Sequence, residues 1–268
     1  MLRSAAMPRL LVLGLVLLLS GCAGEGSATF ASAAADGSAT PLRGNLYKPD
    51  GAGPFPAVVL LHGCSGMHRH AEIWGRRLAD WGYVAFTVDS FRPRGYETVC
   101  GRGMAVPPAT RARDAYAAAE HLRKLPEVRA DRVAAIGFSH GGWTVMQLVQ
   151  SGLAERIGAR PLQAAVAYYP YCDGYSDRDP AIPTLILIGE LDDWTPASRC
   201  RVLEQGYRRP ELVTSVYYPN AYHAFDSEAP LRWAAGARGA MHRLEYDRIA
   251  APDSFARTRA FLDRHLKP

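Results

Sequence analysis

Ser139 is the first residue of the chain with the surroundings of a nucleophile, because the segment 137–141 reads G-F-S-H-G. An apolar run over residues 133–136 precedes this motif, and a helix-like segment follows it as far as Leu148. A serine at the tip of a sharp strand-to-helix turn has strained backbone, and glycine two residues before and after it avoids collisions. Such a turn exposes the Ser139 hydroxyl and puts the His140 N–H at a helix N-terminus, where it can bind an oxyanion. The alternative is an ordinary turn that contains a serine.

An activated serine needs a general base, and the base needs an acid that orients it. Among the eight histidines, His223 alone follows a late predicted strand, over residues 214–218. Two adjacent aspartates, Asp192 and Asp193, follow the strand predicted before it, over residues 184–188. Functional groups of open α/β sheets gather beyond the carboxyl ends of the strands, so we expect these side chains to meet the serine there. One aspartate would accept the Nδ1–H of His223 and leave Nε2 to take the serine proton.

The loop that follows the apolar run 57–61 reads H-G-C-S-G over residues 62–66. Its glycines allow backbone to approach a substrate, and we expect the Cys64 N–H to be the second donor to an oxyanion. His62 ends the preceding strand, and we interpret it as a buried histidine that supports this loop. Cys64 as the nucleophile is the less favoured alternative, because it lacks the strand-to-helix turn around Ser139.

The scaffold that must position these groups alternates between strands and helices. The predicted strands cover residues 44–48, 57–61, 83–88, 133–136, 164–168, 184–188 and 214–218. The predicted helices cover residues 71–81, 110–125, 143–149, 196–207 and 253–266. Such alternation with apolar strands predicts an α/β fold, with a mostly parallel central sheet and helices on both faces. The segments 90–108 and 227–250 interrupt the pattern, and we interpret the second as an insertion beside the active site.

The N-terminus has the features of a bacterial lipoprotein signal. Arg3 and Arg9 are positive, residues 10–19 form an apolar stretch too short to span a bilayer, and the sequence L-S-G-C that ends at Cys22 resembles a lipobox. We expect residues 1–21 to be removed and Cys22 to be lipidated, which anchors the chain on the periplasmic side of the cell envelope. An ordinary secretory signal with an incidental cysteine is the alternative.

After the signal, the chain divides into two parts. Residues 22–40 are mostly Ala, Ser, Gly and Thr, with Phe30 the only large side chain, so we expect a flexible tether. The remaining 41–268 contain one pattern of alternating elements and no internal repeat, which predicts a single folded domain.

Export changes the interpretation of the cysteines. Apart from Cys22, the chain has Cys64, Cys100, Cys172 and Cys200. An even number in an oxidising compartment predicts two disulfides, with three possible pairings. We favour Cys64–Cys100 and Cys172–Cys200, because each would join loops that follow successive strands. Ordinary buried thiols are the alternative.

Charge and cysteine spacing argue against some classes of partner. The formal net charge of the 268 residues is +5, and no basic run is interleaved with aromatic residues, so a nucleic-acid partner is not expected. The cysteines have no metal-type C-x-x-C spacing. Neither a metal nor an organic cofactor is needed for the chemistry that Ser139 and His223 predict.

Taken together, these motifs resemble the dienelactone hydrolase family of α/β-hydrolases, from about Gly44 to the C-terminus. The resemblance includes the loop 62–66, Asp89 followed by R-P-R-G, the turn at 137–141, and the G-x-x-D and Y-H-A-F-D segments of residues 189–192 and 222–226. It implies an α/β-hydrolase fold and a triad of serine, histidine and aspartate. The family spacing G-x-x-D-x-x-x-P selects Asp192 over Asp193 as the acid.

One departure from this family bears on the substrate. The namesake enzymes have a cysteine nucleophile where this chain has Ser139, which favours hydrolysis of carboxylic esters or lactones of small substrates in general over the dienelactone step itself. Arg92 and Arg94 could clamp a substrate carboxylate, or they could be loop arginines satisfied by water and carbonyls. Trp194, beside the acid, could line the pocket or only pack the loop. A peptidase or amidase with the same triad, and a catalytically inactive envelope binding protein, are the alternative functions.

Overall fold

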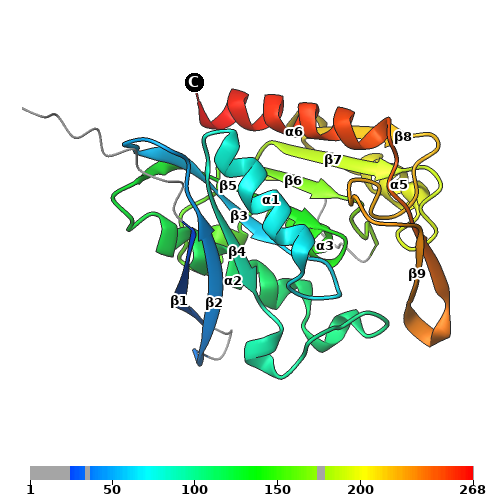
Figure 1. The fold of residues 1–268 in the computed structure, drawn as a ribbon, viewed down its shortest axis with the longest axis horizontal. Coiled ribbons are helices and arrows are strands. Elements are labelled where there is room, and N and C mark those ends of the chain that lie inside the picture. Colours follow the sequence, from blue (N-terminus) through cyan, green and yellow to red (C-terminus); the bar gives the residue numbers. More distant parts are fainter. Residues whose placement is uncertain (1–24, 34–36, 174–178, 268) are drawn as a thin grey trace, which may run out of the picture.

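The computed structural model describes residues 25–33, 37–173 and 179–267, and its centre is an eight-stranded sheet (Figure 1). The strand order is β1-β2-β4-β3-β5-β6-β7-β8. The strands are β1 (Glu25–Ala33), β2 (Ala39–Tyr47), β3 (Phe55–Leu61), β4 (Val84–Asp89), β5 (Val128–Phe138), β6 (Ala164–Tyr168), β7 (Thr184–Gly189) and β8 (Val213–Tyr218). Neighbouring strands from β4 to β8 are parallel, whereas β1 and β2 are antiparallel to their neighbours.

Helices cover both faces of this sheet (Figure 1). They are α1 (Arg69–Asp80), α2 (Pro108–Leu122), α3 (His140–Leu148), α4 (Leu153–Arg156), α5 (Ala197–Glu204) and α6 (Ala250–Leu266). On one face, Trp74 of α1 packs against Phe255 of α6, while α2 and α3 pack together on the other. The central strands β3 to β7 are almost wholly buried, as their apolar runs predict. The predicted α/β-hydrolase fold, a mostly parallel sheet between helices, is confirmed.

The N-terminal edge of the sheet corrects one prediction. Residues 25–33, which the sequence predicts as part of a flexible tether over 22–40, form β1 and pair with β2 along their whole length. This mostly small-residue segment forms a strand because alternate side chains turn inward and make contacts with the core. Phe30 packs against Phe86 with ring centroids 5.6 Å apart, and the Ser32 hydroxyl donates to Asp114 over 2.6 Å. The tether prediction is therefore wrong for this stretch.

The predicted signal peptide (1–21) and the predicted lipidation site, Cys22, lie outside the described residues. Within the described part of the chain, no helix combines the length and apolar character needed to cross a membrane.

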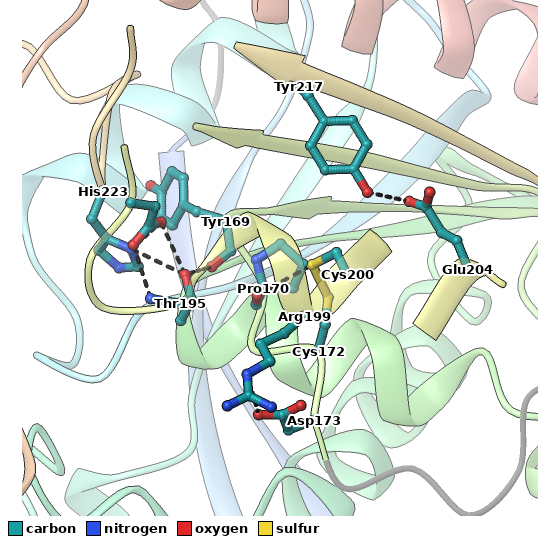
Figure 2. Close-up of a disulfide and its surroundings, with 11 residues drawn as sticks. Tyr169, Pro170, Cys172, Asp173, Thr195, Arg199, Cys200, Glu204, Tyr217 and His223 are labelled. Carbon is teal, nitrogen blue, oxygen red and sulfur yellow. Dashed lines mark hydrogen bonds and ion pairs between the residues drawn. A yellow bond between two sulfur atoms is a disulfide. The ribbon is translucent and has the colours of Figure 1, made fainter. Parts of the chain in front are cut away.

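Two disulfides lie beyond the carboxyl ends of the strands. Cys64 is bonded to Cys100, which joins two loops. Cys172, after β6, is bonded to Cys200 of α5 (Figure 2). The favoured pairing is therefore confirmed. The first disulfide ties the loop after β3 to the segment 90–108, which contains the short 3-10 helices η1 (Arg92–Arg94) and η2 (Gly103–Ala105). Two disulfides are typical of a protein folded in an oxidising compartment, outside the cytosol.

The segment 227–250 contains a separate two-stranded hairpin, β9 (Arg232–Ala235) and β10 (Met241–Leu244). A further short 3-10 helix, η4 (Ala237–Gly239), lies between these two strands, and η3 (Pro210–Leu212) precedes β8. The hairpin reaches back to the sheet, because Leu244 forms a bridge with His223 in the loop after β8. The insertion therefore lies beside the predicted active site.

Candidate active site

The turn between β5 and α3 holds Ser139 in strained backbone, with φ 53° and ψ −112°. A Cβ on Gly137 would overlap the carbonyl oxygen of Gly141, and one on Gly141 would overlap that of Leu61. Only glycine fits at these two positions, which is the physical reason for the G-x-S-x-G pattern. Helix α3 starts at His140, three residues earlier than the sequence predicts, because the turn leads directly into the helix.

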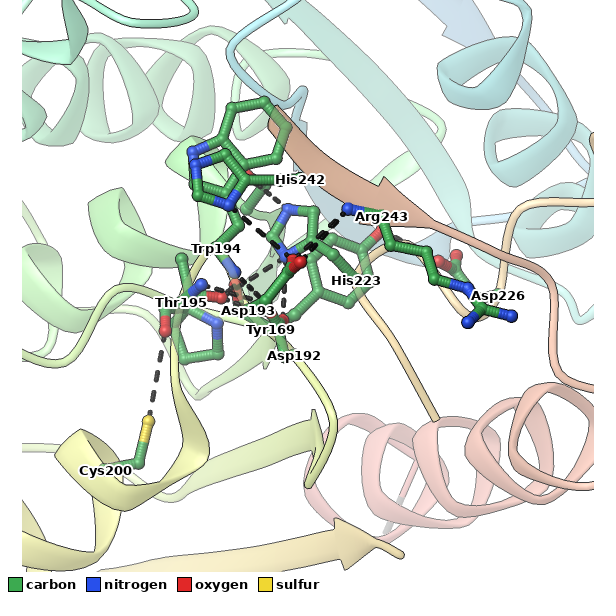
Figure 3. Close-up of polar contacts among 12 residues, drawn as sticks. Tyr169, Asp192, Asp193, Trp194, Thr195, Cys200, His223, Asp226, His242 and Arg243 are labelled. Carbon is green, nitrogen blue, oxygen red and sulfur yellow. Dashed lines mark hydrogen bonds and ion pairs between the residues drawn. The ribbon is translucent and has the colours of Figure 1, made fainter. Parts of the chain in front are cut away.

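The loops after β7 and β8 bring the predicted acid and base to this serine. Nε2 of His223 lies 2.9 Å from the Ser139 hydroxyl. On the other side of the ring, Nδ1 lies 2.7 Å from Oδ2 of Asp192 (Figure 3). His223 and Asp192 are only 2% and 4% exposed, so water does not compete for these bonds. The three side chains form one hydrogen-bonded chain, in the arrangement that activates a serine.

The choice between the adjacent aspartates is clear from their positions. Oδ1 of Asp192 accepts the backbone N–H groups of Trp194 and Thr195 over 2.9 and 2.8 Å, which leaves Oδ2 facing the imidazole. Asp193 is exposed, accepts the backbone N–H of Arg243 and lies outside the hydrogen-bonded chain (Figure 3). The structure therefore places Asp192, and not Asp193, against the histidine.

Thr195 is a residue of the site that the sequence analysis missed. Its hydroxyl lies 2.9 Å from Oδ2 of Asp192, 3.1 Å from the carbonyl of Tyr169 and 3.3 Å from Nδ1 of His223 (Figure 2). The Thr195 hydroxyl can donate its proton to Oδ2 of Asp192 or to the carbonyl oxygen of Tyr169. Both contacts keep the hydroxyl against the carboxylate. A threonine three residues after the acid, with its N–H bonded back to that acid, is a pattern that sequence reasoning could have used.

A second buried carboxylate supports the base from the other side. Asp226 accepts hydrogen bonds from the hydroxyl of Tyr169 (2.7 Å), Nε2 of His70 (2.8 Å) and Nε1 of Trp74 (2.8 Å). Burial acts to raise the pKa of Asp226, but the charge of His70 and these donors lower it below its ordinary value. The Tyr169 ring in turn lies against the His223 ring, with centroids 4.6 Å apart. The hydrogen bond to Asp226 therefore fixes the aromatic ring that His223 packs against.

Ser139 and His223 open on a cavity of about 190 Å³. The loop after β3 lines one part of it and Trp194 lines another, which is the first of the two roles considered for that residue. The hairpin contributes Arg232, Ala234 and Leu244. Among the described residues that line the cavity, Arg232 is the single arginine and none is acidic. A larger groove of about 1100 Å³, between β1–β2 and the start of α1, does not include the triad.

Comparison with known proteins agrees with this geometry. Residues 42–266 match the model of the dienelactone hydrolase family. The chain belongs to the dienelactone hydrolase family. A carboxymethylenebutenolidase-type protein of Synechocystis sp. is 23% identical over 253 residues, covering 84% of this chain and 93% of the relative. The cutinase est1 of Thermobifida alba is 27% identical over 162 residues, covering 58% of this chain and 48% of the cutinase.

Among solved structures, a dienelactone hydrolase-like promiscuous phosphotriesterase from metagenomic libraries is 25% identical, with a TM-score of 0.66. That similarity covers 90% of this chain and 98% of the other. As a member of the dienelactone hydrolase family, the chain is a hydrolase. Within its described residues, no group of three or more His, Cys, Asp or Glu side chains is placed to hold a metal ion.

The two segments that carry the predicted oxyanion donors, the loop after β3 and the start of α3, both lie beside Ser139. Cys64 lines the cavity, and a Cβ on Gly63 would lie 3.6 Å from Cβ of Ser139, so the loop passes directly beside the serine. The disulfide of Cys64 with Cys100 excludes the alternative of a thiol nucleophile in this state. The ring of His140 is buried and points to the carbonyl of Gly103 through Nε2, so only its backbone is available to a substrate.

Neither Arg92 nor Arg94, the possible clamp for a substrate carboxylate, lines the cavity beside Ser139. Both nitrogens at the tip of Arg94 bind Asp114 over 2.9 Å, and Nη1 also donates to the Ser90 carbonyl. Arg92 lies 3.8 Å from Asp89 and lines the larger groove instead. The cause is the turn at η1, which folds Arg94 inward to neutralise a fully buried aspartate.

Proposed function

We propose that this chain is a serine hydrolase that cleaves carboxylic ester or lactone bonds of small substrates through an acyl-enzyme. The observation that carries the proposal is the hydrogen-bonded chain from Asp192 through His223 to Ser139, open to a cavity of about 190 Å³. Membership of the dienelactone hydrolase family supports it. So do the names of two relatives, a carboxymethylenebutenolidase and a cutinase.

In the first step, Nε2 of His223 takes the proton of Ser139 as the serine oxygen attacks the carbonyl carbon. Asp192 stabilises the imidazolium that forms, and Thr195 keeps the carboxylate in place. The negative oxygen of the tetrahedral intermediate lies against the N–H groups of Cys64 and His140. The carbon–oxygen bond of the ester then breaks as His223 returns the proton to the departing alcohol.

In the second step, water replaces the alcohol. His223 takes a proton from this water, the resulting hydroxide attacks the acyl-enzyme, and the serine leaves with the proton. The products are a carboxylic acid and an alcohol, or one hydroxy acid from a lactone. The step uses only groups already present in the site.

The experiment that tests this proposal labels the protein with a fluorophosphonate and measures turnover of p-nitrophenyl esters. We expect one adduct, on Ser139, and a loss of several orders of magnitude in kcat for Ser139→Ala. Ser151→Ala, beyond the far end of α3, is the matched control and keeps wild-type turnover. Wild-type turnover in Ser139→Ala would overturn the assignment.

The same assay separates the alternative functions. Faster turnover of aminoacyl anilides than of esters would indicate a peptidase or amidase. Neither labelling nor turnover would indicate a binding protein that keeps the fold. We expect the ester to be preferred, because the hairpin leaves a small cavity and the described residues form no separate domain that could sort peptides.

We also propose that the chain is an exported lipoprotein, anchored through Cys22 on the periplasmic side. The two disulfides support export, and the apolar stretch before Cys22 supports the signal. Globomycin, which blocks lipoprotein signal cleavage, tests it: we expect the uncleaved form to accumulate, and unchanged processing would contradict the anchor.

A further inference from the structure

A fully buried arginine, Arg111, lies behind the two segments that carry the proposed oxyanion donors. It belongs to the first turns of α2, and its side chain has no access to solvent. Its Nη2 donates a 2.8 Å hydrogen bond to the carbonyl of His62, two residues before Cys64. Its Nη1 donates a second 2.8 Å hydrogen bond to Nδ1 of His140, the residue after the serine. One side chain therefore joins the loop after β3 to the turn after β5.

Phe91 closes the space around this group. The guanidinium carbon of Arg111 lies 4.8 Å from the Phe91 ring centroid. The rings of His62 and His140 meet the same phenyl ring edge-on, with centroids 4.6 and 5.7 Å away. Packing on this side fixes the plane of the guanidinium, and hence the directions of its two donors.

The arginine is held without a paired carboxylate. Among the described residues, its side chain bonds only to the two histidine segments, and Nε has no partner. Burial lowers the pKa of Arg111 to about 9, although the nearby charges of Asp114 and Asp89 act in the opposite direction. Arg111 is thus still charged at neutral pH. A buried charge of this kind is costly, so its retention calls for a role that an apolar residue could not fill.

The histidine partner is neutral. Burial, helped by the charge of Arg111, lowers the pKa of His140 to about 3. Its Nε2–H donates to the Gly103 carbonyl over 2.8 Å, which leaves the lone pair of Nδ1 to accept from Arg111. The ring is therefore a fixed link between the guanidinium and the first residue of α3.

We propose that Arg111 is a positioning residue that sets the separation between the Cys64 and His140 halves of the oxyanion hole. A guanidinium is planar and its Nη groups point in fixed directions, so one rigid group fixes both halves at once. Its charge also lies close to both peptide segments in a dry environment, where it favours negative charge on the substrate oxygen. The inference rests on the proposed function and adds a residue to its machinery.

The test compares Arg111→Met and Arg111→Lys with the wild-type protein on p-nitrophenyl butyrate. Losing one oxyanion donor typically costs about 10²–10³ in kcat. We expect kcat to fall about 10²-fold in Arg111→Met and about 10-fold in Arg111→Lys, with KM changed less than about threefold. Affinity for butylboronic acid, which forms a tetrahedral adduct on the serine, should weaken in parallel with kcat/KM.

Arg123 provides the matched control. It caps the other end of α2, its side chain is 2% exposed, and it binds the backbone carbonyls of Ala130, Arg160 and Pro161. Arg123→Met therefore removes a buried arginine that bridges backbone segments, but far from the serine. We expect its melting temperature to fall while its kcat and boronate affinity stay at wild-type values.

Three results would overturn the inference. They are wild-type kcat in a folded Arg111→Met or Arg111→Lys protein, equal loss of kcat in Arg123→Met, and a loss confined to KM with boronate affinity intact. If Arg111→Met does not fold, Arg111→Lys, which keeps the charge, decides. A wild-type protein without Ser139-dependent esterase activity refutes the proposed function, and this inference with it. Ser139-dependent activity that is insensitive to Arg111 refutes the inference alone.

Discussion

Asp226 accepts a hydrogen bond from Nε2 of the half-buried His70 over 2.8 Å, so a second aspartate–histidine pair lies three residues from His223. The carboxylate is fully buried, and it accepts two further hydrogen bonds, from Trp74 and Tyr169. This pair joins α1 to the loop that carries His223. Its removal should therefore affect the whole domain before it affects any single step of catalysis.

We predict that Asp226→Ala lowers the free energy of unfolding by about 3 kcal/mol or more, because two buried donors, Trp74 and Tyr169, and the half-buried His70 lose their acceptor. Urea denaturation followed by circular dichroism measures this change. Asp193→Ala, at an exposed aspartate, is the control and should stay within about 0.5 kcal/mol of wild type. Similar stability of the two variants would contradict the structural role of Asp226.

Thr195→Val should lower kcat/KM about tenfold, equivalent to about 1.4 kcal/mol, because Asp192 loses a hydrogen-bond donor on the oxygen that holds the base. Thr195→Ser retains the hydroxyl and should retain most of the activity. Steady-state kinetics on one ester compares the two. Equal losses in both variants would show that the methyl group, and not the hydroxyl, matters.

Removing each disulfide in turn should distinguish an effect on stability alone from an effect on both stability and catalysis. Their sequence separations are similar, 36 and 28 residues, so replacing either pair by alanines should cost about 3–4 kcal/mol of stability. Only the Cys64→Ala/Cys100→Ala protein should also lose more than about tenfold in kcat, because its loop carries an oxyanion donor. Differential scanning calorimetry and kinetics on both double variants test this, and equal kcat values would refute it.

Stability should fall on mild acidification. Burial, with the charge of Arg111, holds the pKa of His62 well below its ordinary value near 6.5 and that of His140 at about 3. The unfolded chain therefore binds more protons below pH 6.5, and unfolding is favoured as pH falls from about 6.5 toward 3. We expect His140 to cost about 2 kcal/mol at pH 5, and His62 to act in the same direction. The lowered pKa of Asp226 acts only below about pH 4, outside this window.

Urea denaturation at several pH values measures this dependence. Between pH 6.5 and 5, the free energy of unfolding of His140→Gln should depend less steeply on pH, by the equivalent of about one bound proton. This change in slope is expected whatever the effect of the substitution on stability at pH 7.5. An unchanged slope in His140→Gln would contradict the neutral buried ring.

Much of the fold, and the meeting of Ser139, His223 and Asp192, could be predicted because the signals are local. The glycines around Ser139 reflect overlaps with neighbouring backbone, and the positions of Asp192 and His223 follow from the ends of apolar strands. The disulfides followed from the same topology. Each of these features depends on a few neighbouring residues and on strand order.

The features that were missed depend on contacts between distant segments. Arg94 looked available to a substrate, but its partner, Asp114, lies on a helix 20 residues later. The network of Asp226 joins residues separated by as many as 156 positions. Strand β1 was missed because most of its side chains are small. Its stability comes from backbone pairing with β2 and from the contacts of Phe30 and Ser32 with Phe86 and Asp114, which are distant in the sequence.

Strand β1 has a consequence for how far an anchored molecule could reach. Only three peptide steps separate Cys22 from Glu25, the first residue of β1. Fully extended, they span about 10 Å, whereas a free chain from Cys22 to residue 40 could span about 60 Å. With a lipid on Cys22, the linker between the membrane and the domain would be short. The domain would stay close to the membrane surface and meet esters there, and it would not reach substrates deeper in the periplasm.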